Sequence, residues 1–185
     1  NTLANGIAHY YKMQGETFVF RCINRLDRDT TGLLIIAKNA LSASILSNQM
    51  KRREIHRTYL AVVSGNPKKD TDTITAPIAR KENSAIERCV DFQNGEQAVT
   101  HYQLITSRED YSLLKLSLET GRTHQIRVHM KYIGNPLLGD YLYNPDFSKI
   151  QRVALHSYRL NFIHPITEKT MDFSIPLPED MANLF

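Results

Sequence analysis

The sequence predicts an α+β fold. Short apolar or alternating runs of strand length recur along the chain, whereas apolar residues at helical spacing are confined to three segments. No internal repeat, low-complexity tract or flexible linker interrupts this pattern. With 185 residues, of which 42% are hydrophobic and 23% charged, the chain has the size and composition of one globular domain with a buried core.

Three helices are expected, at 1–15, 40–53 and 122–133, because apolar residues return there every three or four positions. The first pattern stops at Gly15 and the third begins after Gly121, and glycine commonly interrupts regular structure. The second pattern ends in three cations, which suit the C-terminal end of a helix dipole.

Strands are expected at the short apolar runs outside these helices. In chain order they are 18–23, 33–37, 59–63, 100–106, 112–118 and two within 153–175. The run at 33–37 is rich in Ile and Leu, so we expect it to be a buried strand. Residues 68–97 are polar and irregular, and short surface strands are expected there.

Net charge and cysteine content narrow the class of protein. The formal net charge of +4 is compatible with a polyanionic partner such as nucleic acid but does not establish one. Cys22 and Cys89 form no disulfide framework and no metal motif, so we expect free, buried thiols in a reducing compartment, the cytoplasm. No apolar run is long enough to cross a bilayer, and no signal peptide is visible. The chain starts at Asn1 and not at Met, so we expect that an upstream segment is missing.

The most informative segment is residues 24–32, which read Asn-Arg-Leu-Asp-Arg-Asp-Thr-Thr-Gly and lie directly before the apolar run at 33–37. A charged loop held by a core strand is a suitable support for a catalytic carboxylate. Asp27 and Asp29 would share a face, with repulsion between like charges, if the loop is extended; they would diverge if it turns. The structural alternative is a loop that satisfies itself through Arg–Asp pairs and a helix cap.

A second polar segment, residues 119–129, carries two arginines and two histidines at the start of the expected third helix. Arg122 near the helix N-terminus could bind a phosphate together with free backbone N–H groups. His124 and His129 are five residues apart and make no chelating pair on a helix or a strand, so we expect no metal site. A solvated basic helix is the alternative explanation. Tyr59 lies within an alternating strand and, taken alone, is expected to be a packing residue.

Taken together, these segments resemble the large-subunit (RluA-type) family of RNA pseudouridine synthases over nearly the whole chain. Residues 24–32 resemble the family's His-Arg-Leu-Asp-x-x-Thr-Ser/Thr-Gly motif, and residues 57–65 resemble its Lys/Arg-x-Tyr-x-Ala-x-Val-x-Gly strand. Residues 119–140 resemble its Thr-Gly-Arg-x-His-Gln-Ile-Arg-x-His segment and the part that follows, and residues 154–181 fit the family's C-terminal pattern. Because four motifs occur in the same order, the resemblance is specific.

The resemblance implies the pseudouridine synthase catalytic fold, a mixed and mostly antiparallel sheet with flanking helices and a central active-site cleft. It also implies a monomeric enzyme that isomerises uridine in folded ribosomal or transfer RNA without a metal or an organic cofactor. Asp27 would be the carboxylate that acts on a flipped-out uridine, Tyr59 the residue that stacks on the base and takes the C5 proton, and Arg127 the cation that pairs with Asp27. The residues expected to contact RNA are Arg25, Arg28, Thr30, Arg122, His124 and Gln125.

Two features depart from the family pattern. Asn24 stands where the family usually has His, and we expect this to affect loop geometry or an RNA contact, not the chemistry. The family also has an earlier strand with a Lys-Pro-Gly motif, and many members carry an S4-type RNA-binding domain before it; neither is in this sequence. We therefore treat residues 1–185 as the catalytic domain without these N-terminal parts.

Two other functions fit part of the pattern. A catalytically inactive RNA-binding module of the same fold, acting in ribosome assembly, would tolerate the loss of the three catalytic-type residues, and all three are present. A glycoside hydrolase needs two independent carboxylates about 5 Å or more apart that flank the scissile bond. Asp27 and Asp29 lie on one short loop, which disfavours that chemistry.

Overall fold

The computed structural model describes residues 2–185. Its helices are α1 (Leu3–Met13), α2 (Ala40–Lys51), α3 (Gln125–Tyr132) and α4 (Glu179–Ala182). Its strands are β1 (Thr31–Gly32), β2 (His56–Ser64), β3 (Thr71–Thr75), β4 (Ile78–Arg80), β5 (Arg88–Val90), β6 (Val99–Ser107), β7 (Tyr111–Leu118), β8 (Leu155–Ile163) and β9 (Thr170–Ser174). Within the described part of the chain, no helix has the length and apolar character needed to span a membrane.

The chain divides into two compact units. Unit 1 comprises Asn1–Arg25, Leu34–Ile55 and Asn161–Asp172. Unit 2 comprises Leu26–Leu33, His56–Leu160 and Phe173–Phe185. Strands β8 and β9 contribute residues to both units.

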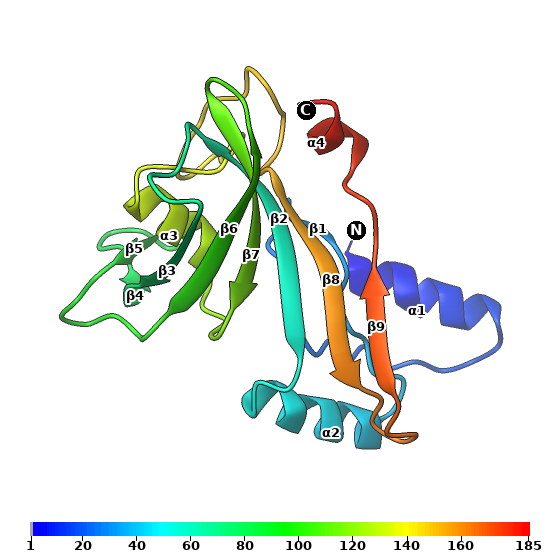
Figure 1. Cartoon of the computed structure of the whole chain (residues 1–185). Helices are drawn as coiled ribbons and strands as arrows, with labels where there is room; N and C mark the ends of the chain where they lie inside the picture. Colours follow the sequence, from blue (N-terminus) through cyan, green and yellow to red (C-terminus); the bar gives the residue numbers. More distant parts are fainter. Residues whose placement is uncertain (1) are drawn as a thin grey trace. The chain divides into compact units, whose positions relative to one another are not determined.

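The strands form a seven-stranded sheet and a separate two-stranded sheet of β4 and β5. The order in the larger sheet is β1-β8-β2-β7-β6-β3, and β9 pairs with β8. Figure 1 shows the long strands β2, β7 and β6, which pair with their neighbours in antiparallel fashion. Strand β1 pairs with β8 in parallel, through Thr31 opposite His156. The prediction of an α+β fold with a mixed, mostly antiparallel sheet is confirmed.

Strand β2 is buried on both faces, which explains its almost continuous run of apolar residues. Tyr59, Ala61 and Val63 share one apolar cluster, and the alternate residues Leu60 and Val62 share another. On the first face the cluster includes buried side chains of α3, so the helix is fixed against the middle of the sheet. The prediction that Tyr59 shares a face with Ala61 and Val63 is confirmed.

Capping side chains explain where the first two helices begin. The hydroxyl of Thr2 accepts a hydrogen bond from the backbone N–H of Asn5 at 3.2 Å, and the amide oxygen of Asn39 accepts one from Ser42 at 2.8 Å. Both helices were expected from the spacing of their apolar residues.

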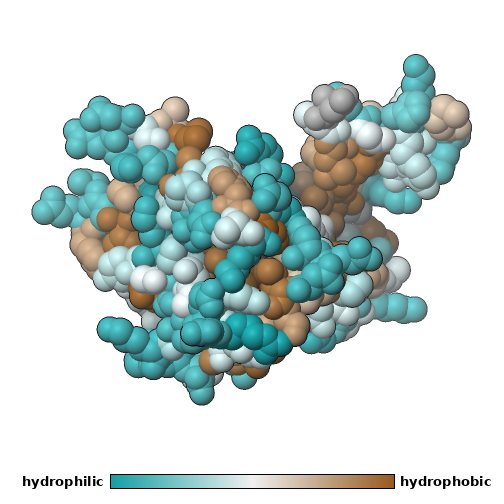
Figure 2. All heavy atoms as spheres, turned by 90° about the horizontal axis from the view of Figure 1, so that it is seen from above, coloured by the Kyte–Doolittle hydropathy of each residue, from teal (hydrophilic) through white to brown (hydrophobic). Residues whose placement is uncertain are grey.

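No side chain of α1 is buried, however, and Met13 is 74% exposed. Figure 2 shows one face of the molecule, on which exposed apolar side chains lie among hydrophilic ones.

The predicted strands at 18–23 and 33–37 are wrong. Only an isolated bridge, between Cys22 and Ile36, joins the two segments. The side chain of buried Asn24 is inserted between them and accepts a hydrogen bond from the backbone N–H of Ile35 at 2.8 Å, so a regular ladder does not form. Cys22 is exposed, contrary to the expected buried thiol. A strand forms just before this run, at β1.

Gly32 in β1 is a position where only glycine fits. Its φ angle is +116°, and an added Cβ would lie 2.4 Å from the backbone oxygen of Ser157 in the neighbouring strand. Gly32→Ala is therefore expected to lower the free energy of unfolding by about 2–4 kcal/mol, measured by urea unfolding followed by circular dichroism. The matched control is Gly6→Ala inside α1, where an added Cβ meets nothing within 4 Å; it should be neutral or stabilise by about 0.5–1 kcal/mol. Equal effects of the two substitutions would contradict this account of β1.

Candidate active site

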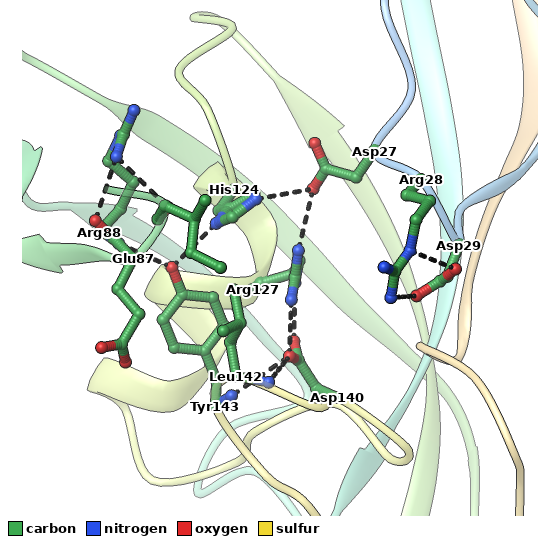
Figure 3. A network of polar contacts seen from close by, with 11 residues as sticks. Asp27, Arg28, Asp29, Glu87, Arg88, His124, Arg127, Asp140, Leu142 and Tyr143 are labelled. Atoms are coloured by element: carbon green, nitrogen blue, oxygen red, sulfur yellow. Dashed lines mark hydrogen bonds and ion pairs between the residues drawn. The ribbon is translucent and has the colours of Figure 1, made fainter. Parts of the chain in front are cut away.

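Asp27 lies at the start of a tight turn in unit 2. The backbone N–H of Thr30 donates to the carbonyl of Asp27 at 3.0 Å, and β1 begins directly afterwards. Because the chain turns here, the two carboxylates of the loop diverge. Asp29 accepts two hydrogen bonds of 3.1 Å from the guanidinium of Arg28, whereas Asp27 faces α3 (Figure 3). The structural alternative, a local Arg–Asp pair, thus accounts for Asp29 but not for Asp27.

Arg127 on α3 supplies the cation opposite Asp27. Its Nη1 lies 3.4 Å from Oδ2 of Asp27, although the two residues are 100 positions apart in sequence. The guanidinium is only 1% exposed, whereas the side chain of Asp27 is 25% exposed. The carboxylate is therefore accessible from solvent and has a buried, fixed positive charge behind it.

A second carboxylate holds Arg127 in place. Nε and Nη2 of Arg127 each donate to Asp140 at 2.7 Å, a bidentate pair in which Asp140 is completely buried. The rings of Tyr141 and Tyr143 lie 5.1 and 5.0 Å from the guanidinium. Burial opposes the charge of Arg127, but the hydrogen bonds and charge of Asp140, together with the charge of Asp27, raise the pKa of Arg127 above its ordinary value.

Asp140 is a member of this polar network that the sequence analysis did not single out. Its Oδ1 also accepts hydrogen bonds from the backbone N–H groups of Leu142 and Tyr143, at 3.0 and 3.1 Å, so the turn itself fixes the carboxylate. The sequence points to such a partner only indirectly, because an arginine on the inward face of a helix requires a negatively charged acceptor. The sequence does not specify which carboxylate supplies it.

Tyr59 of β2 belongs to the same apolar cluster as Ile126 of α3, and the partly buried side chains of Leu26 and Tyr141 pack against this cluster. Burial raises the pKa of the Tyr59 phenol, Arg57 lowers it, and the negative charge of Asp27 raises it further. Asp27 and Tyr59 therefore interact electrostatically. The phenol keeps its proton at neutral pH.

His124 is the third polar group beside Asp27. Its Nε2 lies 3.9 Å from Oδ2 of Asp27, and its Nδ1 lies 2.9 Å from the hydroxyl of Tyr143 (Figure 3). The helix predicted from residue 122 begins only at Gln125, because His124 has a left-handed backbone with φ of 58°. Burial lowers the pKa of His124, and the charge of Arg127 adds to this, against the opposite effect of Asp27.

His129 belongs to a different network from His124. It is fully buried, with Nδ1 2.9 Å from the hydroxyl of Thr100 and Nε2 2.9 Å from the carbonyl of Ala76. Burial lowers its pKa, so the imidazole is a neutral part of the core. Over residues 2–185, no three or more His, Cys, Asp or Glu side chains are grouped so that they could hold a metal ion.

Three of the residues expected to contact RNA lie at the surface. Arg28 pairs with Asp29 and lies 4.8 Å from the ring of Tyr141. Arg122 donates to the carbonyl of Gln97 at 3.0 Å and pairs with Glu96. Arg25 is exposed and belongs to unit 1.

Besides His124, which lies next to Asp27, the two remaining expected RNA contacts are less accessible. The hydroxyl of Thr30 is buried and has no hydrogen-bond partner within residues 2–185. Gln125 is 3% exposed, and the hydrogen bonds of its side-chain amide are made to other groups of the protein. Its nitrogen donates to Val99 and Thr100, and its oxygen accepts from Thr120 and from the backbone of Arg122. Gln125 can therefore affect RNA only through the turn that it holds.

Known proteins with similar sequences and structures agree on one family. Residues 7–132 match the family described as RNA pseudouridylate synthase. The chain is 46% identical over 183 residues to an uncharacterized RNA pseudouridine synthase of Bacillus subtilis, YjbO, covering 99% of this chain and 64% of that protein. It is 36% identical over 197 residues to ribosomal large subunit pseudouridine synthase D of Escherichia coli, covering 99% of this chain and 60% of that protein.

A solved structure supports the same assignment. The human protein RNA Pseudouridylate Synthase Domain Containing 1 superposes with a TM-score of 0.77 at 26% identity, covering 95% of this chain and 74% of that one. The chain thus spans less than two thirds of the length of the two bacterial relatives, but the family match extends over more than half of the chain. The chain belongs to the RNA pseudouridylate synthase family.

Proposed function

We propose that this protein isomerises uridine in structured RNA to pseudouridine, with Asp27 as the carboxylate that acts on the ribose. The observation that carries the proposal is the 3.4 Å contact between Asp27 and buried Arg127. An attacking carboxylate needs a fixed orientation and an accessible oxygen; buried Arg127 holds one side of Asp27, whose side chain is 25% exposed. The family membership of the chain supports the same reaction.

The reaction needs no oxidant, reductant or water. Asp27 either attacks C1′ of the uridine or removes a ribose proton, and the C1′–N1 bond breaks. The freed uracil rotates, C1′ bonds to C5, the proton on C5 is lost, and N1, which kept the electron pair of the broken bond, takes up a proton. Asp27 is restored when the new bond forms, so the product is an isomer of the substrate. Exclusion of water during this sequence prevents hydrolysis at C1′.

Tyr59 is proposed to stack on the flipped base. Its raised pKa fits this role, because a neutral phenol ring offers an apolar face with one hydrogen-bonding group. Tyr59 could also take the C5 proton, but only if it passes on its own proton in the same step. The surface residues Arg28 and Arg122 are proposed to bind phosphates, and Arg25 to fill the space that the flipped uridine vacates. Thr30 and His124 are proposed to lie closer to the target nucleotide.

Ribosomal large-subunit RNA is the first substrate to test, because the E. coli relative is named a ribosomal large subunit pseudouridine synthase. Transfer RNA is the second. We further propose that the protein works as a monomer in the cytoplasm. Both cysteines are free thiols, which fits a reducing compartment.

The experiment is a tritium-release assay on RNA labelled at C5 of uridine. RNA from cells that lack the gene is used, so that the target site is unmodified. Formation of the C1′–C5 bond expels the label into water, and we expect release from one class of RNA at a few sites, which chemical mapping of pseudouridine then locates. Tight binding of ribosomal and transfer RNA without any release would reject the proposal and favour the inactive RNA-binding module.

A further inference from the structure

His124 occupies the N-cap position of α3, where a side chain often caps the helix, but the His124 side chain does not. It makes no side-chain hydrogen bond to the helix. Its backbone is left-handed, a conformation that costs free energy for a residue with a Cβ atom. Both features direct the imidazole away from the helix and toward Asp27, with the ring at 81° to that of Tyr143.

The hydrogen bonds around Tyr143 favour one nitrogen of His124 as the site of its proton. The backbone N–H of Arg88 donates to the Tyr143 oxygen at 2.8 Å. That oxygen lies 2.9 Å from Nδ1 of His124, and its own proton is free to point there. If the hydroxyl donates to Nδ1, the proton of a neutral imidazole is on Nε2, the atom that faces the carboxylate of Asp27 (Figure 3).

We propose that His124 is a positioning residue for Asp27: the Tyr143 hydroxyl holds its imidazole in the Nε2–H form, and this N–H, together with Arg127, orients the attacking carboxylate. The inference rests on the proposed function and assigns His124 a role through Asp27 instead of an RNA contact. Arg127 approaches Oδ2 at 3.4 Å and His124 approaches the same oxygen at 3.9 Å, which leaves Oδ1 for the substrate. At 3.9 Å the contact is longer than a hydrogen bond, so Nε2–H attracts Asp27 electrostatically in this arrangement and donates to it when the two groups approach.

The charged groups around the imidazole are compatible with a neutral ring. Asp27 and Asp140 favour its protonation, while Arg127 and Arg88 oppose it. Burial is the largest effect and lowers the pKa of His124. Burial also raises the pKa of Tyr143 to about 12, so its hydroxyl remains a donor at neutral pH.

Two substitutions at position 124 distinguish the role of Nε2 from that of Nδ1. The amide nitrogen of Gln lies near the place of Nε2 and can still donate to Asp27, whereas the shorter Asn places its amide near Nδ1. We expect His124→Asn to lower kcat about 10- to 100-fold with KM changed less than about threefold. His124→Gln should stay within about fivefold of wild type in both constants. If the two variants raise KM alike and leave kcat unchanged, His124 is an RNA contact and the proposal is wrong.

Tyr143→Phe tests the link through the hydroxyl. In the wild-type background it should lower kcat several-fold, because Nδ1 is released and the Nε2–H form is no longer enforced. In the His124→Gln background the same change should have no further effect on kcat, since no imidazole remains to be oriented. Additive losses in the double variant would mean that Tyr143 acts independently of His124.

A spectroscopic measurement is independent of activity. Long-range ¹H–¹⁵N correlation spectra report which imidazole nitrogen is protonated, and loss of one signal set in His124→Gln assigns His124. We expect the neutral Nε2–H form near pH 7.5 and a mixture of forms in Tyr143→Phe. The Nδ1–H form in the wild type would overturn the inference even if the enzyme is active. An Nε2–H form in a protein without any isomerase activity would instead reject the proposed function alone.

Discussion

Asp27→Asn is expected to abolish pseudouridine formation while the protein remains folded. A carboxamide has nearly the same shape as the carboxylate but cannot attack C1′ or remove a ribose proton, so we expect kcat to fall on the order of 10⁴-fold or more. Stability should change by less than about 1 kcal/mol, because the side chain is partly exposed and its contacts with Arg127 and His124 are long, at 3.4 and 3.9 Å. Tritium release and urea unfolding measure the two effects.

The matched control for this prediction is Asp29→Asn, in the same turn. Asp29 pairs with Arg28, whose side chain is 75% exposed, and the dashed lines in Figure 3 join its carboxylate to Arg28 and not to Arg127. Asp29→Asn should change kcat by no more than a few-fold. If Asp27→Asn forms pseudouridine at the wild-type rate, or if Asp29→Asn is the inactive variant, the assignment of the attacking carboxylate is wrong.

The sequence was sufficient to predict the regular elements with strong local signals. Strand β2 and helices α2 and α3 follow from apolar periodicity, and the β6–β7 pair follows from two alternating runs around a polar turn. The prediction of a strand at 33–37 failed because the composition of this run is that of a buried strand, whereas its backbone N–H groups donate to several separate segments and not to one neighbouring strand. The N–H of Leu33 donates to Ser157, and that of Ile35 donates to the side chain of Asn24. Local composition does not encode such partners.

Asn24 illustrates the same limit at a family position. The sequence leaves open whether Asn in place of the usual His affects loop geometry or an RNA contact. In the structure its amide oxygen accepts from Ile35 and its side chain is buried, which is a loop-geometry role within unit 1. The nitrogen of that amide has no hydrogen-bond partner within residues 2–185. The bond depends on two segments meeting, which the motif does not reveal.

In the candidate site, too, some residues could be predicted from the sequence and others could not. The motifs single out Asp27 and Arg127, and resemblance to a family pairs them. Neither the spacing nor the resemblance predicts the left-handed turn at His124, which places an imidazole beside the carboxylate. The bidentate partner of Arg127 is also missing from a motif-based site, because an ion pair depends on where Asp140 lies in three dimensions.

Asp140→Ala is the substitution with the largest expected effect on stability. It leaves Arg127, which is 1% exposed, without its bidentate partner, and it removes the acceptor of two backbone N–H groups. Loss of one member of a buried ion pair costs about 3–5 kcal/mol, because the remaining charge is neither solvated nor paired. Urea unfolding should show a loss of this size. In Asp140→Asn the loss should be smaller, since an amide oxygen can still accept hydrogen bonds.

A double replacement separates stability from function. Arg127→Met with Asp140→Asn removes both charges, fills a similar volume and keeps an amide oxygen that can accept from the backbone N–H groups of Leu142 and Tyr143. Replacements of buried ion pairs by uncharged residues are often neutral or stabilising. We expect the double variant to lie within about 1–2 kcal/mol of wild type in its free energy of unfolding and to form no pseudouridine. A stable but inactive double variant would mean that the pair is kept for the charge it places behind Asp27, not for the fold. A double variant as unstable as Asp140→Ala would show that packing around Tyr141 and Tyr143 requires the guanidinium itself, and residual activity near wild type would remove Arg127 from the mechanism.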